Sequence, residues 1–279
     1  MVKSLSPLRY PGGKSKIYDK IRNLIEINAL NDKTYVEPFA GGFGIGIRLL
    51  CDNVVKSAVL NDYDSHIYHF WYAILHHTDD LVRMITDTPV TLTERKKQLK
   101  IYMSDTSDKI CDGFATLFLN RVNFSGVIKG GPIGGQSQNG AYKINCRFQK
   151  KEIIKRIEKI ASLKSRIKLY HCDANKLISG CLQNKITTSF FNIDPPYVQK
   201  GQRLYTNFFK KEEHIRLEET ITKHLSKTQW VITYDDCDLV RDIYKNYYMI
   251  RYSIQHNVGN SMKGKELVIT NIPKDSFAW

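Results

Sequence analysis

The amino-acid sequence predicts an α/β protein with a mostly parallel sheet covered by helices on both faces, and three observations support this. Apolar runs typical of strands alternate with helical patterns in the first and last parts of the chain. Near the end, two strand patterns follow one another without a helix between them, which predicts a terminal antiparallel hairpin. The middle has a helical pattern followed by a glycine-rich segment, which predicts an inserted subdomain.

The parallel strands are expected at residues 34–38, 58–62, 168–172, 189–193 and 229–235. Helices are expected between them, for example over 14–29 and 211–225. The terminal hairpin should pair residues 248–254 with 266–271. We therefore expect one main domain formed by residues 1–64 and 148–279.

The predicted insert spans residues 65–147. Its first part has an apolar stripe at helical spacing, which indicates a packed core: Ile67, Phe70, Trp71, Ile74 and Leu75. Residues 124–144 carry six glycines, five of them at positions 130–140 around Pro132, a composition that cannot pack a core. This segment predicts an extended β-hairpin or a flexible loop.

The composition indicates which class of partner and which compartment to expect. The 279 residues carry a formal net charge of +14, which favours a polyanionic partner, although a lysine-rich solvated surface gives the same value. No apolar run reaches the roughly 18 residues of a membrane span, and residues 1–8 lack the apolar core of a signal peptide. The six cysteines show no C-x-x-C pair, so we expect them to be reduced, without metal, in the cytoplasm.

A tetrapeptide at the end of the predicted strand 189–193 carries the expected chemistry. Asp194, Pro195, Pro196 and Tyr197 place a carboxylate, a stiff turn and an aromatic ring at one strand tip. The prolines lack N–H groups, so the carbonyls of this turn remain available as acceptors. These groups can hold a planar exocyclic amine; the alternative is an ordinary strand-ending turn.

A glycine-rich turn follows the first strand and predicts a nucleotide-type site. Gly41 and Gly42 allow close approach of a ligand to the backbone before the next helix. The spacing is not the dinucleotide G-x-G-x-x-G, because Ile47 stands where its last glycine would be. An acid about 20 residues on, Asp62, suits ribose hydroxyls.

A third motif, residues 9–15, reads Arg-Tyr-Pro-Gly-Gly-Lys-Ser. Its Gly-Lys-Ser is not a P-loop, because Leu8 occupies the position of the required first glycine. Lys14, at the start of a helix, is placed to meet a small carboxylate, with Tyr10 as a stacking face. The alternative is a loop with a solvated lysine.

Together the three motifs resemble the Dam-type (D12 class, alpha group) DNA adenine N6-methyltransferases, in the order that this group shows. The resemblance covers nearly the whole chain and is weakest over residues 65–147. It implies a Rossmann-like sheet that binds S-adenosylmethionine as methyl donor, with residues 65–147 as the target-recognition insert. It also implies double-stranded DNA as the partner, with the target adenine flipped out of the duplex.

The resemblance also implies roles for individual residues. Asp194 and the carbonyl of Pro195 would accept the two N–H bonds of the amine, and Tyr197 would stack on the base. The implied cofactor residues are Tyr10, Lys14, Glu37, Phe39, Ala40, Gly41, Gly42, Asp62, Asp173, Ala174 and Asp194. The implied DNA contacts are Arg9, Asn120, Arg121, Asn123, Lys129, Tyr142 and Lys143, with a hairpin entering the duplex.

Several points stay open. Residues 125–129 depart from the familiar Dam segment, so the recognition sequence is undetermined, and the basic stretch 147–168 is either a solvated helix face or a phosphate contact. The same fold could act on another planar amine, in N4-cytosine, RNA or a protein amide, or could be a noncatalytic DNA-binding derivative. No cysteine follows a proline, which argues against cytosine C5 chemistry. We expect a monomer, and any cognate restriction endonuclease would be a separate chain.

Overall fold

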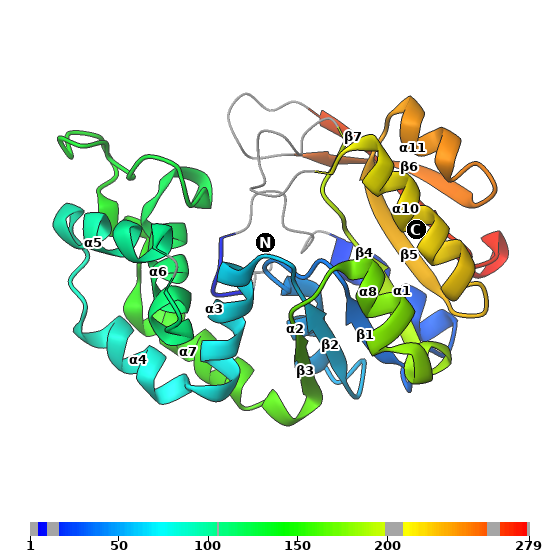
Figure 1. Ribbon diagram of the computed structural model, residues 1–279, viewed down its shortest axis with the longest axis horizontal. Coiled ribbons are helices and arrows are strands. Elements are labelled where there is room, and N and C mark those ends of the chain that lie inside the picture. Colours follow the sequence, from blue (N-terminus) through cyan, green and yellow to red (C-terminus); the bar gives the residue numbers. More distant parts are fainter. Residues whose placement is uncertain (1–4, 10–16, 105, 199–208, 256–262, 278–279) are drawn as a thin grey trace. The chain divides into compact units, whose positions relative to one another are not determined.

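The computed structural model describes residues 5–9, 17–104, 106–198, 209–255 and 263–277 (Figure 1). The chain divides into two compact units, which are described separately. The helical unit consists of Met1–Gly13 and Asp64–Ser165, and the sheet unit consists of Lys14–Tyr63 and Arg166–Trp279.

The sheet unit contains a seven-stranded sheet in the order β3-β2-β1-β4-β5-β7-β6. Its strands are β1 (Thr34–Glu37), β2 (Ala58–Asn61), β3 (Ile167–Tyr170), β4 (Ser189–Ile193), β5 (Trp230–Asp235), β6 (Tyr248–Gln255) and β7 (Lys263–Thr270). The first five strands are parallel, whereas β7 runs antiparallel between β5 and β6. This strand order confirms the predicted Rossmann-like methyltransferase sheet with its terminal antiparallel hairpin.

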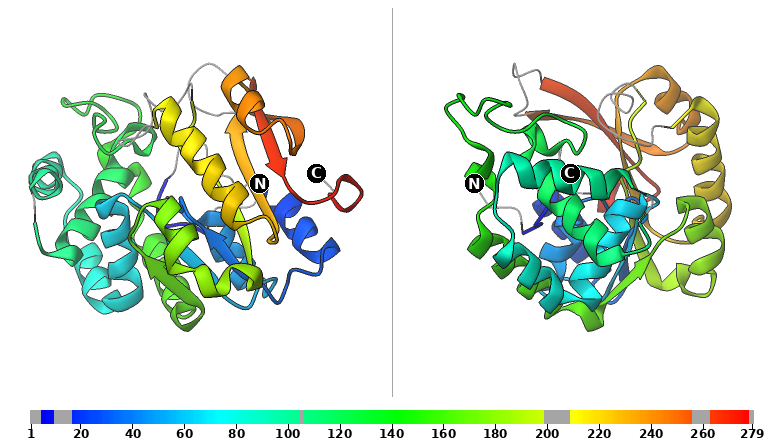
Figure 2. Two further views of the ribbon diagram at one scale, coloured as in Figure 1. Left: turned by 45° about the vertical axis from the view of Figure 1, so that its right-hand side comes forward. Right: turned by 60° about the vertical axis from the view of Figure 1, so that its left-hand side comes forward.

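Helices cover the sheet, and their apolar faces explain their positions. They are α1 (Tyr18–Ile27), α2 (Gly44–Cys51), α8 (Ala174–Lys176), α10 (Lys211–His224) and α11 (Asp238–Ile243). Leu217 and Ile221 of α10 are fully buried and share one core with strand residues such as Phe191 and Ile232. Figure 2 shows α10 and α8 lying in front of the strands in its left view. Burial of both sheet faces explains why the central strands read as continuous apolar runs.

Strand β3 ends earlier than predicted. We expected a strand over residues 168–172, directly before Asp173, but β3 stops at Tyr170. The Asp173 carboxylate instead caps α8, accepting hydrogen bonds from the backbone N–H groups of Asn175 and Lys176 at 3.0 and 3.2 Å. This is the ordinary behaviour of an aspartate at the N-cap, which satisfies backbone donors that a strand would have paired.

The helical unit contains α3 (Ser65–His76), α4 (Thr78–Asp87), α5 (Leu92–Met103), α6 (Lys109–Val122) and α7 (Lys150–Ala161). Helix α6 is its centre and is buried over most of its length. Gly113 lets α6 approach α3 closely, because a Cβ there would lie 2.6 Å from the backbone oxygen of His69. The expected helical core residues Phe70, Trp71 and Ile74 are fully buried, which confirms that this stripe is packing.

The compact units differ from the expected domain division in two places. Helix α7, which we placed in the main domain, packs on α3 and α4, because its apolar face with Ile153, Ile157 and Ile160 is buried there. Residues 5–9 also belong to the helical unit, where Asn120 binds the Arg9 backbone.

The predicted β-hairpin in residues 124–144 is wrong. The segment contains turns and the short 3-10 helix Phe124–Gly126, and a single bridge joins Asn123 to Pro132. Its backbone has positive φ at Ser125, Gly134 and Gln138, a conformation that a regular strand ladder cannot contain. The amide of Gln138 organises the loop instead, donating to the Ile133 carbonyl at 2.8 Å and accepting from the Ile144 N–H at 2.8 Å.

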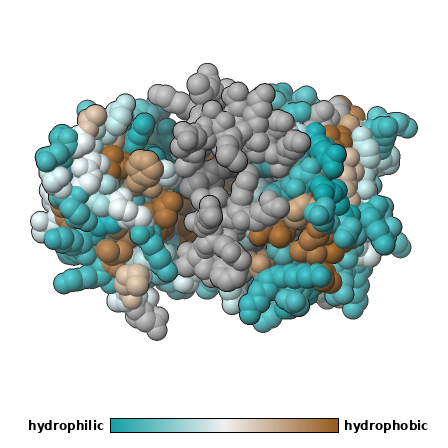
Figure 3. Space-filling view, turned by 90° about the horizontal axis from the view of Figure 1, so that it is seen from above, coloured by the Kyte–Doolittle hydropathy of each residue, from teal (hydrophilic) through white to brown (hydrophobic). Residues whose placement is uncertain are grey.

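The visible surface is mostly hydrophilic, with small separate apolar patches (Figure 3). Two of the most exposed aromatic side chains, Phe124 at 69% and Tyr142 at 66%, lie on the glycine-rich segment. Within the described ranges, no helix is long and apolar enough to cross a membrane.

Candidate active site

The expected site lies at the carboxyl ends of β1 and β4, which are neighbours in the sheet. The chain leaves β1 toward β2 and β3 and then returns to β4 on the other side of β1, so the strand order reverses at this point. In open α/β sheets, ligands bind in the crevice formed at such a reversal. The glycine-rich turn follows β1 and the tetrapeptide follows β4, so the topology brings the two motifs together.

Asp194 is held by the neighbouring strand. Its Oδ1 accepts a hydrogen bond of 2.7 Å from the Thr233 hydroxyl of β5, and its side chain is partly exposed. Pro195 is buried and Pro196 partly exposed. The carboxylate is therefore fixed in orientation while it still reaches the surface of the sheet edge.

The Tyr197 side chain is only 8% exposed, which is less than expected for a ring that only stacks on a ligand. Its hydroxyl donates to Oε2 of Glu266 on β7 at 3.0 Å, and the Tyr252 hydroxyl of β6 donates to the same oxygen at 2.6 Å. The next residue is also fixed, because the Val198 N–H donates to Oδ1 of Asp235 at 3.0 Å. Two buried carboxylates, one on β5 and one on the terminal hairpin, thus hold the tetrapeptide loop.

Glu37, the last residue of β1, is a buried carboxylate in a hydrogen-bonded network. Its Oε1 accepts from the Tyr35 hydroxyl at 2.7 Å and from the Gly46 N–H at 3.3 Å. The pKa of Glu37 is raised to about 8, mainly by burial and also by the charge of Asp194, against the lowering effect of the hydrogen bonds.

The glycine-rich turn has the geometry that its sequence suggests. Gly41 adopts a positive φ of 46°, and its N–H donates to Oδ2 of Asp62 at 2.8 Å. Phe43 also has a positive φ, and its ring lies so close to Gly46 that a Cβ there would be 2.3 Å from it. The turn therefore requires glycine at position 46, which the sequence analysis did not single out.

Asn61, at the end of β2, joins the loops that follow β1 and β3. Its amide donates to the carbonyls of Pro38 at 2.8 Å and Cys172 at 2.9 Å, and its Oδ1 accepts from the Cys172 N–H at 3.1 Å. The side chain is fully buried. Asn61 was not predicted as a site residue, because its role depends on contacts with residues more than 20 and 100 positions away.

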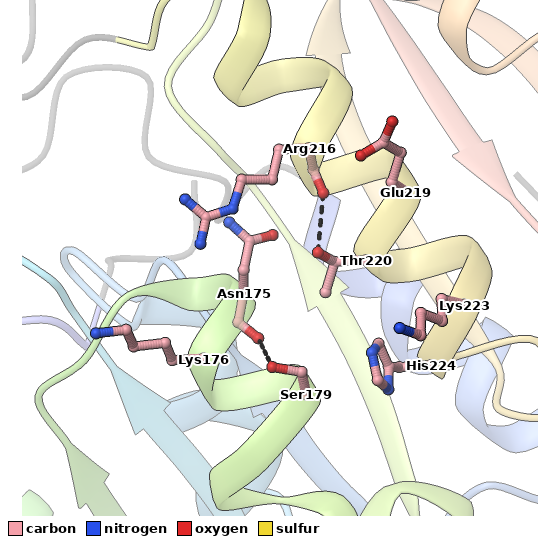
Figure 4. A pocket seen from close by; sticks show the side chains of 8 residues that line it. All are labelled: Asn175, Lys176, Ser179, Arg216, Glu219, Thr220, Lys223 and His224. Carbon is pink, nitrogen blue, oxygen red and sulfur yellow. Dashed lines mark hydrogen bonds between the residues drawn. The ribbon is translucent and has the colours of Figure 1, made fainter.

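An open polar groove of about 460 Å³ lies between α8 and α10 (Figure 4). It is lined by Asn175, Lys176, Ser179, Arg216, Glu219, Thr220, Lys223 and His224. None of the predicted site residues lines it. The groove adjoins the predicted residue Asp173, whose carboxylate accepts from the backbone N–H groups of Asn175 and Lys176 and lies 4.0 Å from the Arg216 guanidinium.

Other predicted cofactor residues have mixed outcomes. Phe39 is partly buried and its ring meets that of Phe209 edge-on at 5.7 Å, while Ala40, Gly42 and Ala174 are buried. Tyr10 and Lys14 lie outside the described residues. No cluster of three or more potential metal ligands occurs in the part of the chain that the structure describes.

In the helical unit, two predicted DNA contacts have internal roles. The Asn120 amide accepts from the Arg9 N–H at 2.7 Å and donates to the Arg9 and Gly126 carbonyls, both at 2.9 Å. Asn123 is fully buried and donates to the Ile128 carbonyl at 2.6 Å. The polar atoms of these side chains already bind and shape the loop, and their predicted contact with DNA stays a prediction.

Arg121 lies in a cluster of like charges in the same unit. Burial, together with the nearby charges of Arg156, Arg9 and Arg147, lowers its pKa to about 10. Its buried Nε has no hydrogen-bond partner, and within the described ranges no carboxylate pairs with any of these four arginines. Lys129, Tyr142 and Lys143 are exposed, as expected for residues that meet a partner.

The strand order and the two motifs at its reversal define a methyltransferase-type site. The model of the D12 class N6 adenine-specific DNA methyltransferase family matches residues 10–258. The chain therefore belongs to this family of adenine-specific DNA methyltransferases.

A curated relative and two solved structures are similar to the chain. The chain is 23% identical over 235 residues to the Type II methyltransferase M.MjaIII of Methanocaldococcus jannaschii, and the match covers 77% of this chain and 78% of the relative. An uncharacterized protein from Listeria monocytogenes serotype 4b has a TM-score of 0.39 at 7% identity, covering 92% of this chain and 70% of that one. The rRNA methyltransferase aviRa from Streptomyces viridochromogenes has a TM-score of 0.38 at 11% identity, covering 89% and 83%. The fold assignment depends on the strand order and not on these weak structural likenesses.

Proposed function

We propose that this protein transfers a methyl group from S-adenosylmethionine to the N6 amine of an adenine flipped out of double-stranded DNA. The observation that carries the proposal is the placement of Asp194 and the Gly41 turn at the ends of two adjacent parallel strands, where the strand order reverses. Incubation of the protein with duplex DNA and labelled S-adenosylmethionine, followed by nucleoside analysis, tests it. N6-methyladenine supports the proposal, whereas N4-methylcytosine, or label transferred only to RNA or protein in parallel incubations, would replace it with one of the alternatives.

The residues at the strand ends fit this methyl donor. Asp62 offers an acceptor to ribose hydroxyls while it holds the Gly41 N–H, and the left-handed turn at Gly41 lets the backbone approach a ligand closely. Glu37 is a buried carboxylate that suits an ammonium group. When bound, the sulfonium of the donor supplies an electrophilic methyl carbon.

The tetrapeptide would orient the amine. Asp194, fixed by Thr233, and the carbonyl of Pro195 would accept its two N–H bonds and direct the nitrogen lone pair toward the methyl carbon. Tyr197 is held by Glu266 in one orientation before the base arrives. Such preorganised positioning is the main contribution that the protein makes to a transfer of this kind.

The arginine cluster would bind the DNA backbone. Four guanidinium groups without an acidic partner repel one another, and a phosphate placed among them would relieve this repulsion. Arg121 would be the central contact, and Lys129 and Lys143 on the glycine-rich segment would add charge. Asn120 and Asn123 would act indirectly, by holding Arg9 and this segment.

Cofactor binding should occur without DNA. Titration calorimetry of the free protein with S-adenosylmethionine should give a single binding event, and Asp62→Asn should weaken it, because the amide is a poorer acceptor for ribose hydroxyls and for the Gly41 N–H. Asp238→Asn, an exposed substitution on α11, should bind as the wild type does. Absence of binding to folded wild-type protein would contradict the assignment of the glycine-rich turn.

The DNA interface should appear as salt dependence. Replacement of Lys129 and Lys143 by alanine, or of Arg121 by glutamine, should weaken DNA binding and reduce the slope of log K against log salt by about 0.9 for each phosphate that the variant no longer neutralises. Lys223→Ala on α10 should leave the slope unchanged and serves as the control. An unaltered slope in both variants would exclude these basic residues of the helical unit as phosphate contacts.

A further inference from the structure

Two buried residues outside the recognised motifs connect the catalytic strand to the cofactor strand. The Asn192 amide of β4 donates to the Tyr35 hydroxyl of β1 at 2.7 Å, and that hydroxyl donates to Oε1 of Glu37 at 2.7 Å. Asn192 is two residues before Asp194, and Tyr35 is two residues before Glu37. The side chains of Asn192, Tyr35 and Glu37 are at most 7% exposed.

We propose that Asn192 and Tyr35 are positioning residues that orient the Glu37 carboxylate to receive the α-ammonium group of the methyl donor. This inference rests on the proposed function, because it concerns how the same site holds its cofactor. It adds two residues that none of the three motifs contains.

The direction of the hydrogen bonds supports this role. Because Asn192 donates to the Tyr35 oxygen, the hydroxyl proton of Tyr35 is left to point at Glu37. Burial and the Glu37 charge raise the pKa of Tyr35 well above its usual value, so the hydroxyl remains a donor at any working pH. The two successive hydrogen bonds from Asn192 to Tyr35 and from Tyr35 to Glu37 form a relay. This relay supplies a fixed hydrogen bond to the Glu37 carboxylate and adds no second titrating group.

The hydrogen bonds to Glu37 favour its charged form. Tyr35 and the Gly46 N–H both donate to Oε1, and a hydrogen bond from the Asn192 side chain also lowers the pKa of Glu37. Without the Tyr35 bond, ionisation of Glu37 next to Asp194 would be harder, and an ammonium ligand would bind less well. The charged groups that face Glu37 are Asp194 from β4 and the ligand itself, and its neutral donors come from β1, β4 and α2.

The test compares cofactor affinity between variants over a range of pH. Titration calorimetry with S-adenosylmethionine should show Tyr35→Phe binding about tenfold more weakly than wild type at pH 7, since a hydrogen bond to a charged group is removed. The ratio of the two dissociation constants should shrink toward one above about pH 9, where Glu37 is ionised in both free proteins. Titration of the ligand amine is common to both proteins and cancels in this ratio.

Matched variants distinguish loss of the Glu37 orientation from a general disturbance of the fold. Tyr18→Phe removes another buried tyrosine's bond to a carboxylate, that of Asp52, in the same unit and should give a ratio of one throughout. Asn192→Leu should give the same pH-dependent weakening as Tyr35→Phe but smaller, and it serves as the test if Tyr35→Phe does not fold. If the variants bound S-adenosylmethionine more weakly by the same factor at all pH values, or bound it as the wild type does, the proposed positioning role would be contradicted. Wild-type protein that binds no S-adenosylmethionine at any pH would instead overturn the proposed function.

Discussion

Asp194→Ala should reduce methyl transfer by about a hundredfold or more while the protein remains folded. The substitution removes the acceptor that we propose for the target amine, and loss of an interaction made mainly in the transition state costs several kcal/mol. The Asp194 side chain is partly exposed and is held by the Thr233 hydroxyl of β5, so its removal disturbs little packing. Single-turnover rates with preformed complexes of protein and duplex DNA measure this directly.

Two controls accompany this experiment. Asp238→Asn changes an exposed carboxylate at the start of α11 and should keep the wild-type rate. Thr233→Val keeps the Asp194 carboxylate but removes its orienting hydrogen bond, so its rate should fall between those of wild type and Asp194→Ala. A near wild-type rate for Asp194→Ala would reduce the tetrapeptide to a strand-ending turn.

Sequence pattern predicted the sheet well because each central strand is buried on both faces. Strand β4 was predicted with its observed bounds, and the antiparallel pairing of β6 and β7 followed from the absence of a helix between them. A loop over residues 124–144 was one of two predicted alternatives, but its shape was not predicted, because that shape depends on positive φ at non-glycine positions such as Ser125 and on the Gln138 amide. Glycine content alone does not distinguish such a loop from a hairpin.

The strand-tip motifs were predictable, but their supports were not. Glu266 and Tyr252 lie opposite each other in the terminal hairpin, and only that register brings their side chains to the Tyr197 hydroxyl. Likewise, Asn61 and Asn192 look like ordinary polar residues at the ends of apolar runs. A buried polar residue within such a run is the available signal, since it must find a hydrogen-bond partner in the fold.

The charges of the site also differ from those of the whole chain. The protein carries a formal net charge of +14, yet the carboxylates Glu37, Asp235 and Glu266 are buried within the sheet unit. Desolvated carboxylates destabilise the fold unless a ligand or hydrogen bonds compensate them. Glu37 keeps a raised pKa of about 8 in spite of its hydrogen bonds, and its proposed role in binding leads to a prediction in which stability and binding change in opposite directions.

Glu37→Gln should stabilise the cofactor-free protein at neutral pH. In the folded wild-type protein the pKa of Glu37 is about 8, above the ordinary value of 4.5. At a pH between these two values, folded Glu37 therefore keeps a proton that the unfolded chain releases. The contribution of Glu37 to stability is therefore greatest below about pH 4.5 and is lost as the pH rises toward 8. Glutamine keeps an acceptor for Tyr35 and Gly46 without this pH-dependent cost, so the free energy of unfolding should rise by up to about 3 kcal/mol at pH 7.

The same substitution should nearly abolish binding of S-adenosylmethionine, because it removes the carboxylate that we propose meets the ammonium group. Denaturant unfolding of both proteins at about pH 5, 7 and 8.5 measures the first effect, and calorimetry at about pH 7 measures the second. The gain in the free energy of unfolding should be small at the lowest pH and should reach its maximum near pH 8. The control Glu219→Gln, at an exposed position on α10, should change neither the stability nor the affinity for the methyl donor. A Glu37→Gln protein that is less stable than wild type at the highest pH, or that binds the methyl donor normally, would show that Glu37 is a structural residue whose charge the site does not use.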